Sequence, residues 1–256
     1  MDLRFRHPKI EQKGFGLASE IVKDEIWDST GWGFTSNFPR VKINKERQCE
    51  EKNMSFVGII NNKDGVFAFA DNRNTSDGTA DFERPNVKKI YSNDNMILVA
   101  CGTGKIVDIN DDTTPLDVIL KDYIEDKKYN LEDFIKHFIT YLSEKLCSSY
   151  FHFIAFNKDT YKFDSFVIED MTYKFIERNE NDFCDGAAWF KSLFETYTHK
   201  NNIFILTNDD FETMITEQII PVIRTVDKSI FYSPVSPSFD VIEYNLSGNE
   251  IVKRFE

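Results

Sequence analysis

The chain has 256 residues, of which 41% are hydrophobic and 29% are charged, and its formal net charge is −12. A chain of this length and composition can bury a sizeable core, which excludes extensive disorder. The negative balance argues against broad binding to nucleic acids or anionic membranes, because both need a basic surface.

The first 53 residues differ from the rest of the chain. We predict that 1–53 form an N-terminal extension or prosegment ahead of a domain that spans 54–256. A short helix is expected over 18–27, and the charged run 46–52 is typical of a solvated linker. The chain shows neither the apolar segment of a secretory signal nor a run of the ~18–20 apolar residues that span a membrane. These features predict a cytoplasmic protein.

The cysteines and histidines carry little sign of metal or redox chemistry. No two of the four cysteines form a C-x-x-C pair, and three of them lie in or beside apolar runs, where free cysteines behave as small hydrophobes. The four histidines lack zinc-ligand spacing, and the sequence has no phosphate-binding loop and no G-x-S-x-G elbow. The sequence therefore predicts a reducing compartment, no metal and no cofactor. The cysteines are Cys49, Cys101, Cys147 and Cys184.

The domain is predicted to begin with two β-hairpins. The first pairs 55–61 with 66–72 around Asp64-Gly65, because Asp-Gly favours tight turns. The second joins strands near 87–91 and 96–101 through four polar residues, which is another turn signal.

Two helices are predicted after these hairpins. Thr114 can cap the first helix, with Pro115 at its first helical position. Asn130 can cap the second, in which apolar residues recur at helical spacing from Leu131 to Leu142.

The second half of the domain is predicted to contain five further strands. Three short strands at 151–156, 163–168 and 173–177 are separated by polar turn residues. A closing hairpin is expected to pair 240–245 with 250–254.

Two more helices are predicted between those strands and the closing hairpin. One passes through 189–197, and the other opens at Asn208, where an acidic first turn suits the helix dipole. Pro221 is expected to kink or split this second helix. Two antiparallel sheets packed face to face, with helix pairs outside them, would bury all the predicted apolar faces.

The stretch from Met54 to Gly104 places an acid, a lysine and a glycine pair at strand ends. Asp71 stands in an Ala-Asp-x-Arg context, Lys89 follows Asn-Val-Lys, and Gly104 closes Cys-Gly-Thr-Gly. This order resembles the opening of the proteasome-type N-terminal-nucleophile (Ntn) hydrolases, and the element order extends the resemblance over 54–256. The resemblance implies an α+β fold, a four-layer αββα sandwich of two antiparallel sheets.

The resemblance also implies the chemistry. In this family the nucleophile is the first residue of the mature chain, and its own α-amine is the general base, a role that suits an amine whose pKa is near ~8. Cleavage in front of the nucleophile creates this catalyst. Asp71 matches the family's aspartate, Lys89 its catalytic lysine, and Gly104 the glycine whose N–H binds the oxyanion. Lys88 would then be solvated, because strand neighbours point to opposite faces.

The nucleophile position has two candidates. Counting back from Asp71 gives Ser55, a serine where the family usually has threonine, whereas counting from Val57-Gly58 gives Met54, which cannot be the nucleophile. A one-residue shift swaps the strand faces, so only one register can hold. The acid and serine partners that the family has later in the chain have three candidates here, which are Asp227, Ser233 and Ser236.

Two functions from different classes stay open. In the first, the chain is a self-processed peptidase or amidohydrolase of the threonine-peptidase type, with Ser55, Asp71, Lys89 and Gly104 as its site. In the second, the extension stays attached and the domain is a non-catalytic relative that acts through assembly or binding. Expected partners are a peptide or amide substrate and copies of the chain or related subunits, with no nucleic acid and no membrane.

Overall fold

The structure is a computed structural model that describes residues 55–76, 79–80, 86–147, 149–176, 182–228 and 235–256. The predicted extension over 1–53, its helix and its charged linker lie outside the described residues, as do Met54 and Ser233.

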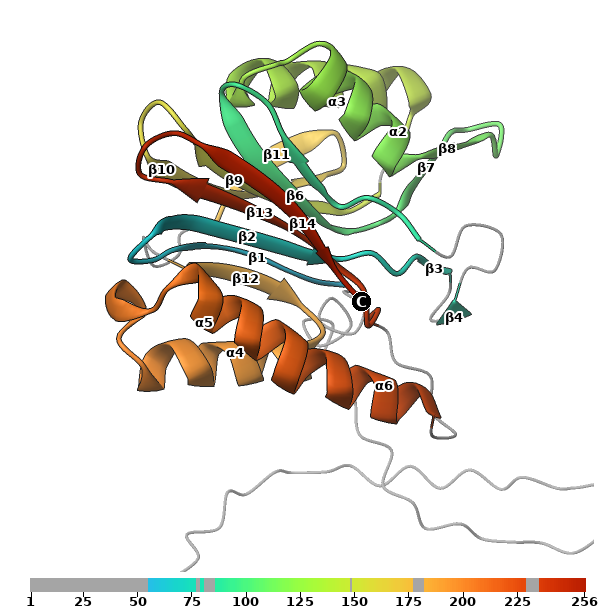
Figure 1. The fold of residues 1–256 in the computed structure, drawn as a ribbon. Helices are drawn as coiled ribbons and strands as arrows, with labels where there is room; N and C mark the ends of the chain where they lie inside the picture. The colour runs from blue at the N-terminus through green and yellow to red at the C-terminus, as the bar shows by residue number, and fades with distance from the viewer. Residues whose placement is uncertain (1–54, 77–78, 81–85, 148, 177–181, 229–234) are drawn as a thin grey trace, which may run out of the picture. The chain divides into compact units, whose positions relative to one another are not determined.

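Two five-stranded antiparallel sheets form the centre of the described domain (Figure 1). The first sheet has the order β12-β1-β2-β13-β14, with bounds Asp182–Gly186, Phe56–Asn61, Gly65–Asp71, Phe239–Asn245 and Glu250–Phe255. The second has the order β11-β10-β9-β6-β5, with bounds Thr172–Phe175, Lys162–Glu169, Phe151–Asn157, Met96–Gly102 and Ile90–Ser92.

Strand alternation divides the apolar side chains among three cores. In β1, Val57 and Ile59 face the second sheet and pack in the layer between the sheets, whereas Phe56 and Ile60 face the opposite way, toward helices. β2 repeats the pattern, with small Ala68 toward the second sheet. Because β1 and β2 are apolar on both faces, the first sheet can be covered on both sides where these strands lie.

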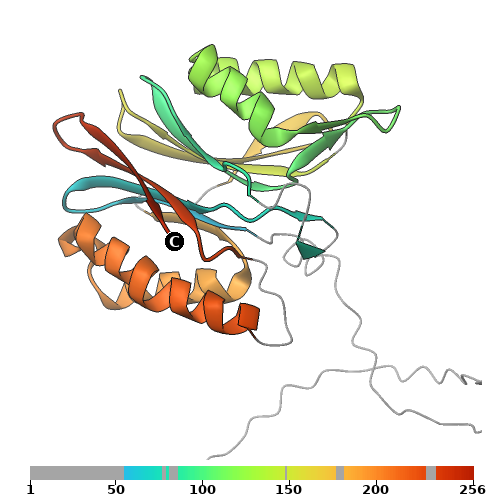
Figure 2. The same ribbon diagram turned by 45° about the vertical axis from the view of Figure 1, so that its right-hand side comes forward.

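Helices cover the outer face of each sheet (Figure 2). The second sheet is covered by α2 (Leu116–Leu120), the π-helical η1 (Lys121–Asp126) and α3 (Leu131–Lys145). The first sheet is covered by α4 (Ala188–Lys200), α5 (Asn208–Thr213), the π-helical η3 (Met214–Ile219) and α6 (Ile220–Lys228). The predicted fold class, an α+β four-layer αββα sandwich of two antiparallel sheets, is confirmed. Minor elements are β3 (Thr75–Ser76), β4 (Thr79–Ala80), β7 (Lys105–Val107), β8 (Thr113–Pro115) and the 3₁₀ turn η2 (Ile203–Ile205).

The prediction that Thr114 caps a helix is wrong. Thr114 pairs with Ile106 in the β7–β8 hairpin, and α2 begins after Pro115 without a side-chain cap. Thr114 therefore belongs to a strand and does not cap α2. The cap of α3 is confirmed, because the Asn130 side chain accepts a hydrogen bond from the Asp133 N–H at 2.9 Å.

Two further predictions about the second half need correction. The segment 182–186, which carried no strand prediction, forms β12 and pairs with β1, so four strands rather than three lie between α3 and α4. The helix is not split at Pro221, because α5, η3 and α6 follow one another without a break (Figure 1). The π-helical turn that precedes Pro221 changes the hydrogen-bond pattern where proline has no N–H to donate.

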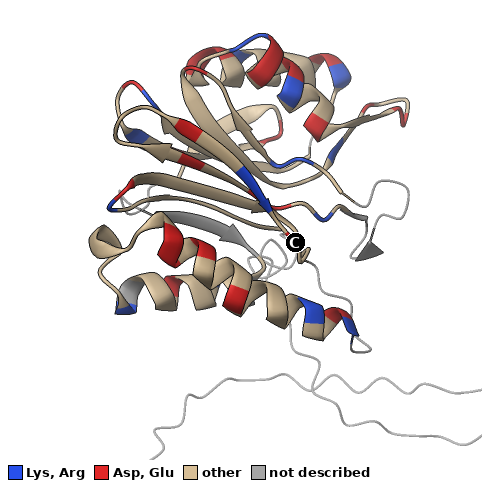
Figure 3. Cartoon of the chain, viewed as in Figure 1, with Lys and Arg blue, Asp and Glu red and all other residues tan. Residues whose placement is uncertain are grey.

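Charged side chains of both signs are spread over the helices (Figure 3). The first turn of α5 is acidic, with Asp209 and Asp210, and the last turn of α6 carries Lys228. This distribution suits the positive N-terminal and negative C-terminal ends of a helix. Among the described residues, no helix is both long and apolar enough to cross a bilayer.

The N-terminus of α5 gives a first testable prediction. The Asp210 carboxylate accepts hydrogen bonds from the Thr207 N–H at 2.8 Å and from its hydroxyl at 2.7 Å, and these bonds lower the pKa of Asp210. A depressed pKa means that the contribution is present above the ordinary value near ~3.9 and is lost as the pH falls through the folded value. Asp210→Asn should reduce the free energy of unfolding by about 1 kcal/mol at pH 7, and by less in acid.

Urea unfolding at pH 7 and pH 3 measures this difference. Asp209→Asn is the matched control, because it removes the same charge from the same turn without touching the capping contact. Equal losses in the two variants would contradict the prediction.

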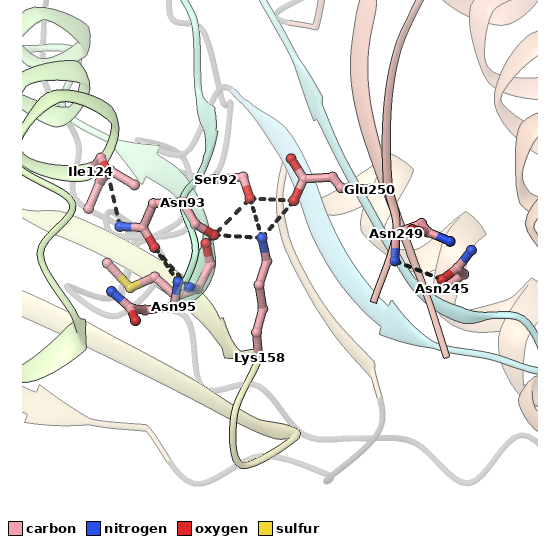
Figure 4. A network of polar contacts seen from close by, with 9 residues as sticks. Ser92, Asn93, Asn95, Ile124, Lys158, Asn245, Asn249 and Glu250 are labelled. Atoms are coloured by element: carbon pink, nitrogen blue, oxygen red, sulfur yellow. Dashed lines mark hydrogen bonds and ion pairs between the residues drawn. The ribbon is translucent and has the colours of Figure 1, made fainter. Parts of the chain in front are cut away.

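A polar clamp joins the two sheets at the end where the hairpin turns lie (Figure 4). The Lys158 ammonium, at the β9–β10 turn, donates to Ser92 Oγ at 2.8 Å, to the Asn93 carbonyl at 2.6 Å and to Glu250 Oε2 at 2.7 Å. It also lies 5.1 Å from the centre of the Tyr244 ring. Ser92 and Asn93 belong to the second sheet's β5–β6 hairpin and Glu250 to the first sheet's β14, so one side chain ties both sheets.

Candidate active site

The carboxylate of Asp71 is the centre of a buried polar cluster at the opposite end of the strands. Asp71 ends β2 and is 0% exposed. One oxygen, Oδ1, accepts hydrogen bonds from the Phe56 N–H at 2.7 Å and from the Lys89 ammonium at 3.0 Å. The other, Oδ2, accepts from the N–H groups of Arg73 at 3.1 Å and Ser236 at 3.2 Å. A buried carboxylate needs such donors, because leaving it unpaired is costly.

Lys89 is the inward member of its lysine pair. Its side chain is 11% exposed, and its ammonium forms an ion pair with Asp71. The Lys88 side chain is 44% exposed and pairs with Glu125 of η1 at the surface. The alternation expected for neighbouring residues in an extended chain therefore brings only one ammonium to the buried carboxylate.

Ser55 directly precedes β1 and is itself buried, with 7% of its surface exposed. Its carbonyl accepts a hydrogen bond from the Ala187 N–H at 2.7 Å, next to the point where β12 pairs with β1. Ser55 precedes Val57 by two residues, so alternation puts it on the side of β1 that faces the second sheet.

Gly104 lies in the loop between β6 and β7. Gly102, which ends β6, has φ +104°, a conformation that suits glycine. The Thr103 N–H donates to the Tyr150 carbonyl at 3.2 Å, and the Gly104 carbonyl accepts from the Leu116 N–H at 3.0 Å. A Cβ atom at Gly104 would lie 3.0 Å from Asn74 Oδ1, so a larger residue would push on that side chain. These contacts fix the path of the loop.

Ser55, Lys89 and Gly104 line one pocket, between the start of β1 and the β6–β7 loop. The pocket has a volume of about 40 Å³. Arg73, Asn74 and Cys101 lie in its wall as well, and Asp71 lies behind it in contact with Lys89. The structure thus brings all four predicted site residues to one end of the sandwich.

Ser236 and Asp227, which are candidates for the acid and serine partners later in the chain, make contacts that hold the structure together. Ser236 is buried and holds Asp71 through its backbone N–H, while its hydroxyl accepts from the Ser238 N–H at 3.1 Å. Asp227, near the end of α6, accepts two hydrogen bonds from the Arg73 guanidinium, at 2.9 and 2.8 Å. This bidentate pair joins the chain just after β2 to the helix layer.

Sequence reasoning missed the backbone part of the cluster. The Phe56 and Ser236 amides bind Asp71, but any residue carries such an N–H, so no side-chain signal marks them. The Arg73–Asp227 pair had a partial signal, since Arg73 belongs to the Ala-Asp-x-Arg context and Asp227 was a candidate acid. The described residues contain no group of three or more His, Cys, Asp or Glu that could hold a metal ion.

The fold and the buried cluster define the chain as a four-layer αββα protein with a lysine–aspartate pair beside the start of β1. No protein-family model matches the chain, and no curated protein matches its sequence. Solved structures with a similar fold include Anbu from Hyphomicrobium sp. strain MC1, at 11% identity and a TM-score of 0.48, and a Gly-1 mutant of Anbu from the same strain, at 12% identity and a TM-score of 0.47. Each alignment covers 78% of this chain and 86% of the Anbu chain.

Proposed function

We propose that this chain is an Ntn-type amide hydrolase, of the proteasome-like kind, that becomes active by cleavage of the bond before Ser55. The observation that carries the proposal is the Asp71 carboxylate, which binds the Lys89 ammonium and the N–H of Phe56 with one oxygen. This carboxylate therefore holds Phe56, which follows the proposed nucleophile, close to Lys89, the proposed catalytic lysine. Both lie beside a pocket that Ser55 lines.

Activation is an attack of Ser55 on the carbonyl of Met54. The hydroxyl oxygen bonds to that carbon, the hydroxyl proton passes to the amide nitrogen, the Met54–Ser55 amide bond breaks, and the nitrogen becomes the α-amine of Ser55. The resulting ester between the Met54 carboxyl and Ser55 is then hydrolysed by water. An amide nitrogen is not basic, whereas the new amine, with an ordinary pKa near ~8, can act as general base.

Substrate cleavage repeats the attack on another chain. The α-amine takes the hydroxyl proton of Ser55, the oxygen attacks the substrate carbonyl, and the oxyanion that forms is bound by the Gly104 N–H. The protonated amine then gives its proton to the leaving nitrogen, and water hydrolyses the ester. The positive charge of Lys89 stabilises the negative charge that develops on Ser55, and Asp71 holds Lys89 in place.

The alternative is a non-catalytic subunit that keeps its extension. The observation that favours it lies in the sequence, where Met54 precedes Ser55 although family members that cleave themselves usually do so after glycine. The domain would then act through assembly or binding, with the buried cluster as a structural feature. Under either alternative we propose a cytoplasmic protein that associates with copies of itself or with related subunits.

Intact-mass measurement of the purified full chain tests the proposal. A fragment that begins at Ser55 is expected, and Ser55→Ala should leave the chain whole because it removes the attacking oxygen. Ser55→Thr is the matched control, since it keeps a hydroxyl at the same atom and should still be cleaved. A wild-type chain that stays intact and is not labelled at Ser55 by electrophilic proteasome inhibitors would support the non-catalytic alternative.

A further inference from the structure

A second group of polar side chains lies in the layer between the sheets, close to the candidate site. Cys101 of β6 and His152 of β9 are paired directly across the two antiparallel strands. Both face the first sheet, because Cys101 packs in the layer between the sheets and His152 alternates with Ile154, which also packs there. Directly paired residues on one face have Cβ atoms about 4.5–5.5 Å apart, so the thiol and the imidazole are neighbours in this layer.

A third residue orients the imidazole. His152 Nε2 lies 2.8 Å from the Ser165 hydroxyl of β10, and both side chains are almost fully buried. When Nε2 carries the proton and donates it to Ser165, Nδ1 is the basic nitrogen. A nucleophile, a base and a residue that orients the base form the arrangement that activates cysteine elsewhere.

Cys101 is buried, but it lies beside the candidate site. Cys101 is 4% exposed and lies in the wall of the pocket that Ser55 and Lys89 also line. The 40 Å³ available there holds only a few water-sized molecules, because one water needs about 10–15 Å³ by this measure. Hydrogen peroxide fits such a space, whereas a hydroperoxide with a bulky organic group does not.

We propose that Cys101 and His152 form a thiol–imidazole pair and that Cys101 is the site at which small hydroperoxides oxidise this chain. The imidazole takes the thiol proton, and the thiolate sulfur attacks one oxygen of hydrogen peroxide. The O–O bond breaks, and the leaving hydroxide takes the proton back from the imidazolium and becomes water. The sulfur is oxidised to a sulfenic acid and the peroxide is reduced.

This inference does not depend on Ser55 being a nucleophile. Its consequence for the proposed function is regulatory, because the added oxygen would occupy the pocket beside Lys89 until a thiol reduces it. The chain also supplies a matched control in Cys147, a free cysteine that is 2% exposed and lies outside the residues that line the pocket.

The test is timed oxidation of the full folded chain with hydrogen peroxide. After quenching with catalase, the protein is unfolded, its remaining thiols are alkylated, and peptide mass spectrometry gives the thiol lost at each cysteine. Cys101 should be oxidised at least about tenfold faster than Cys147, and cumene hydroperoxide should remove this difference. Equal rates for the two cysteines with hydrogen peroxide would overturn the proposal.

Two variants test the role of the imidazole. His152→Gln should bring the rate at Cys101 close to that at Cys147, and Ser165→Ala, which keeps the imidazole but removes its orienting contact, should lower it severalfold. The thermal unfolding midpoint of each variant is measured beside the wild type, so that Ser165→Ala decides if His152→Gln fails to fold. An unchanged rate at Cys101 in a folded variant would also overturn the pair. Intact-mass measurement at Ser55 is unaffected by these results, so failure here is distinguishable from failure of the proposed hydrolase.

Discussion

Replacing Lys89 by methionine should abolish cleavage before Ser55 and lower the free energy of unfolding by about 3 kcal/mol. The Asp71 carboxylate is fully buried, and Lys89 supplies the positive charge that faces it at 3.0 Å. Methionine has a similar length but no charge, so the carboxylate would keep only its backbone donors. Intact mass reports the cleavage, and urea unfolding reports the stability.

Two controls separate charge from geometry. Lys88→Met removes a lysine one position away, but that side chain is 44% exposed, so a change below about 0.5 kcal/mol and normal cleavage are expected. Lys89→Arg keeps the charge and should recover part of the stability, while its larger planar head displaces the pocket contacts and leaves cleavage impaired. Normal cleavage by Lys89→Met would remove the basis for the catalytic role of Lys89.

The second large effect is expected at the clamp. Lys158→Met should reduce the free energy of unfolding by about 2–3 kcal/mol, because three hydrogen-bonded oxygens, one of them in a carboxylate, lose their common donor. The Lys158 side chain is 9% exposed and that of Glu250 is 26% exposed, so water would replace only part of the lost contacts. The effect should be on stability alone, since the clamp lies at the far end of the strands from Ser55.

Lys128→Met is the matched control for the clamp. Lys128 lies nearby and pairs with Asp94, but the two side chains are 58% and 78% exposed. Such a surface pair contributes little, so the change should stay below about 0.5 kcal/mol in the same urea titration. Equal effects of the two substitutions would show that Lys158 acts only as another surface charge.

Local signals predicted the hairpins and one helix cap well. The turn between β1 and β2 follows from Asp64-Gly65, since Gly65 has φ +136° and a Cβ there would lie 2.3 Å from the Tyr244 carbonyl. The Asn130 cap also needs only nearby residues. Such features depend on a few adjacent positions, so the sequence states them directly.

Features set by pairing with another strand could not be predicted in this way. β12 contains two aspartates and a glycine and becomes a strand by pairing with β1, which lies far away in the sequence. Thr114 was predicted to cap a helix, but the β7–β8 hairpin pairs it with Ile106. The weak β propensity of the first segment and the capping tendency of Thr114 are both overridden by strand pairing.

The candidate site could be predicted only in part from the sequence. Asp71 and Lys89 are eighteen positions apart, and their contact was expected only from the resemblance to a known family. The choice between Met54 and Ser55 depends on the strand register, and Met54 lies outside the described residues. The pairing of Val57 with Ala70, together with the burial of Val57 between the sheets, assigns Ser55 to the side that faces the pocket.

If the bond before Ser55 is cleaved as proposed, the hydrogen bonds around Ser55 stay in place. The Ser55 carbonyl is tied to the Ala187 N–H, and the next amide along, that of Phe56, is tied to Asp71. Both anchors lie on the C-terminal side of the Met54–Ser55 bond, so scission would break neither of them. The strand end that carries the new α-amine would therefore already be anchored. It would need no rearrangement before the first substrate is cleaved.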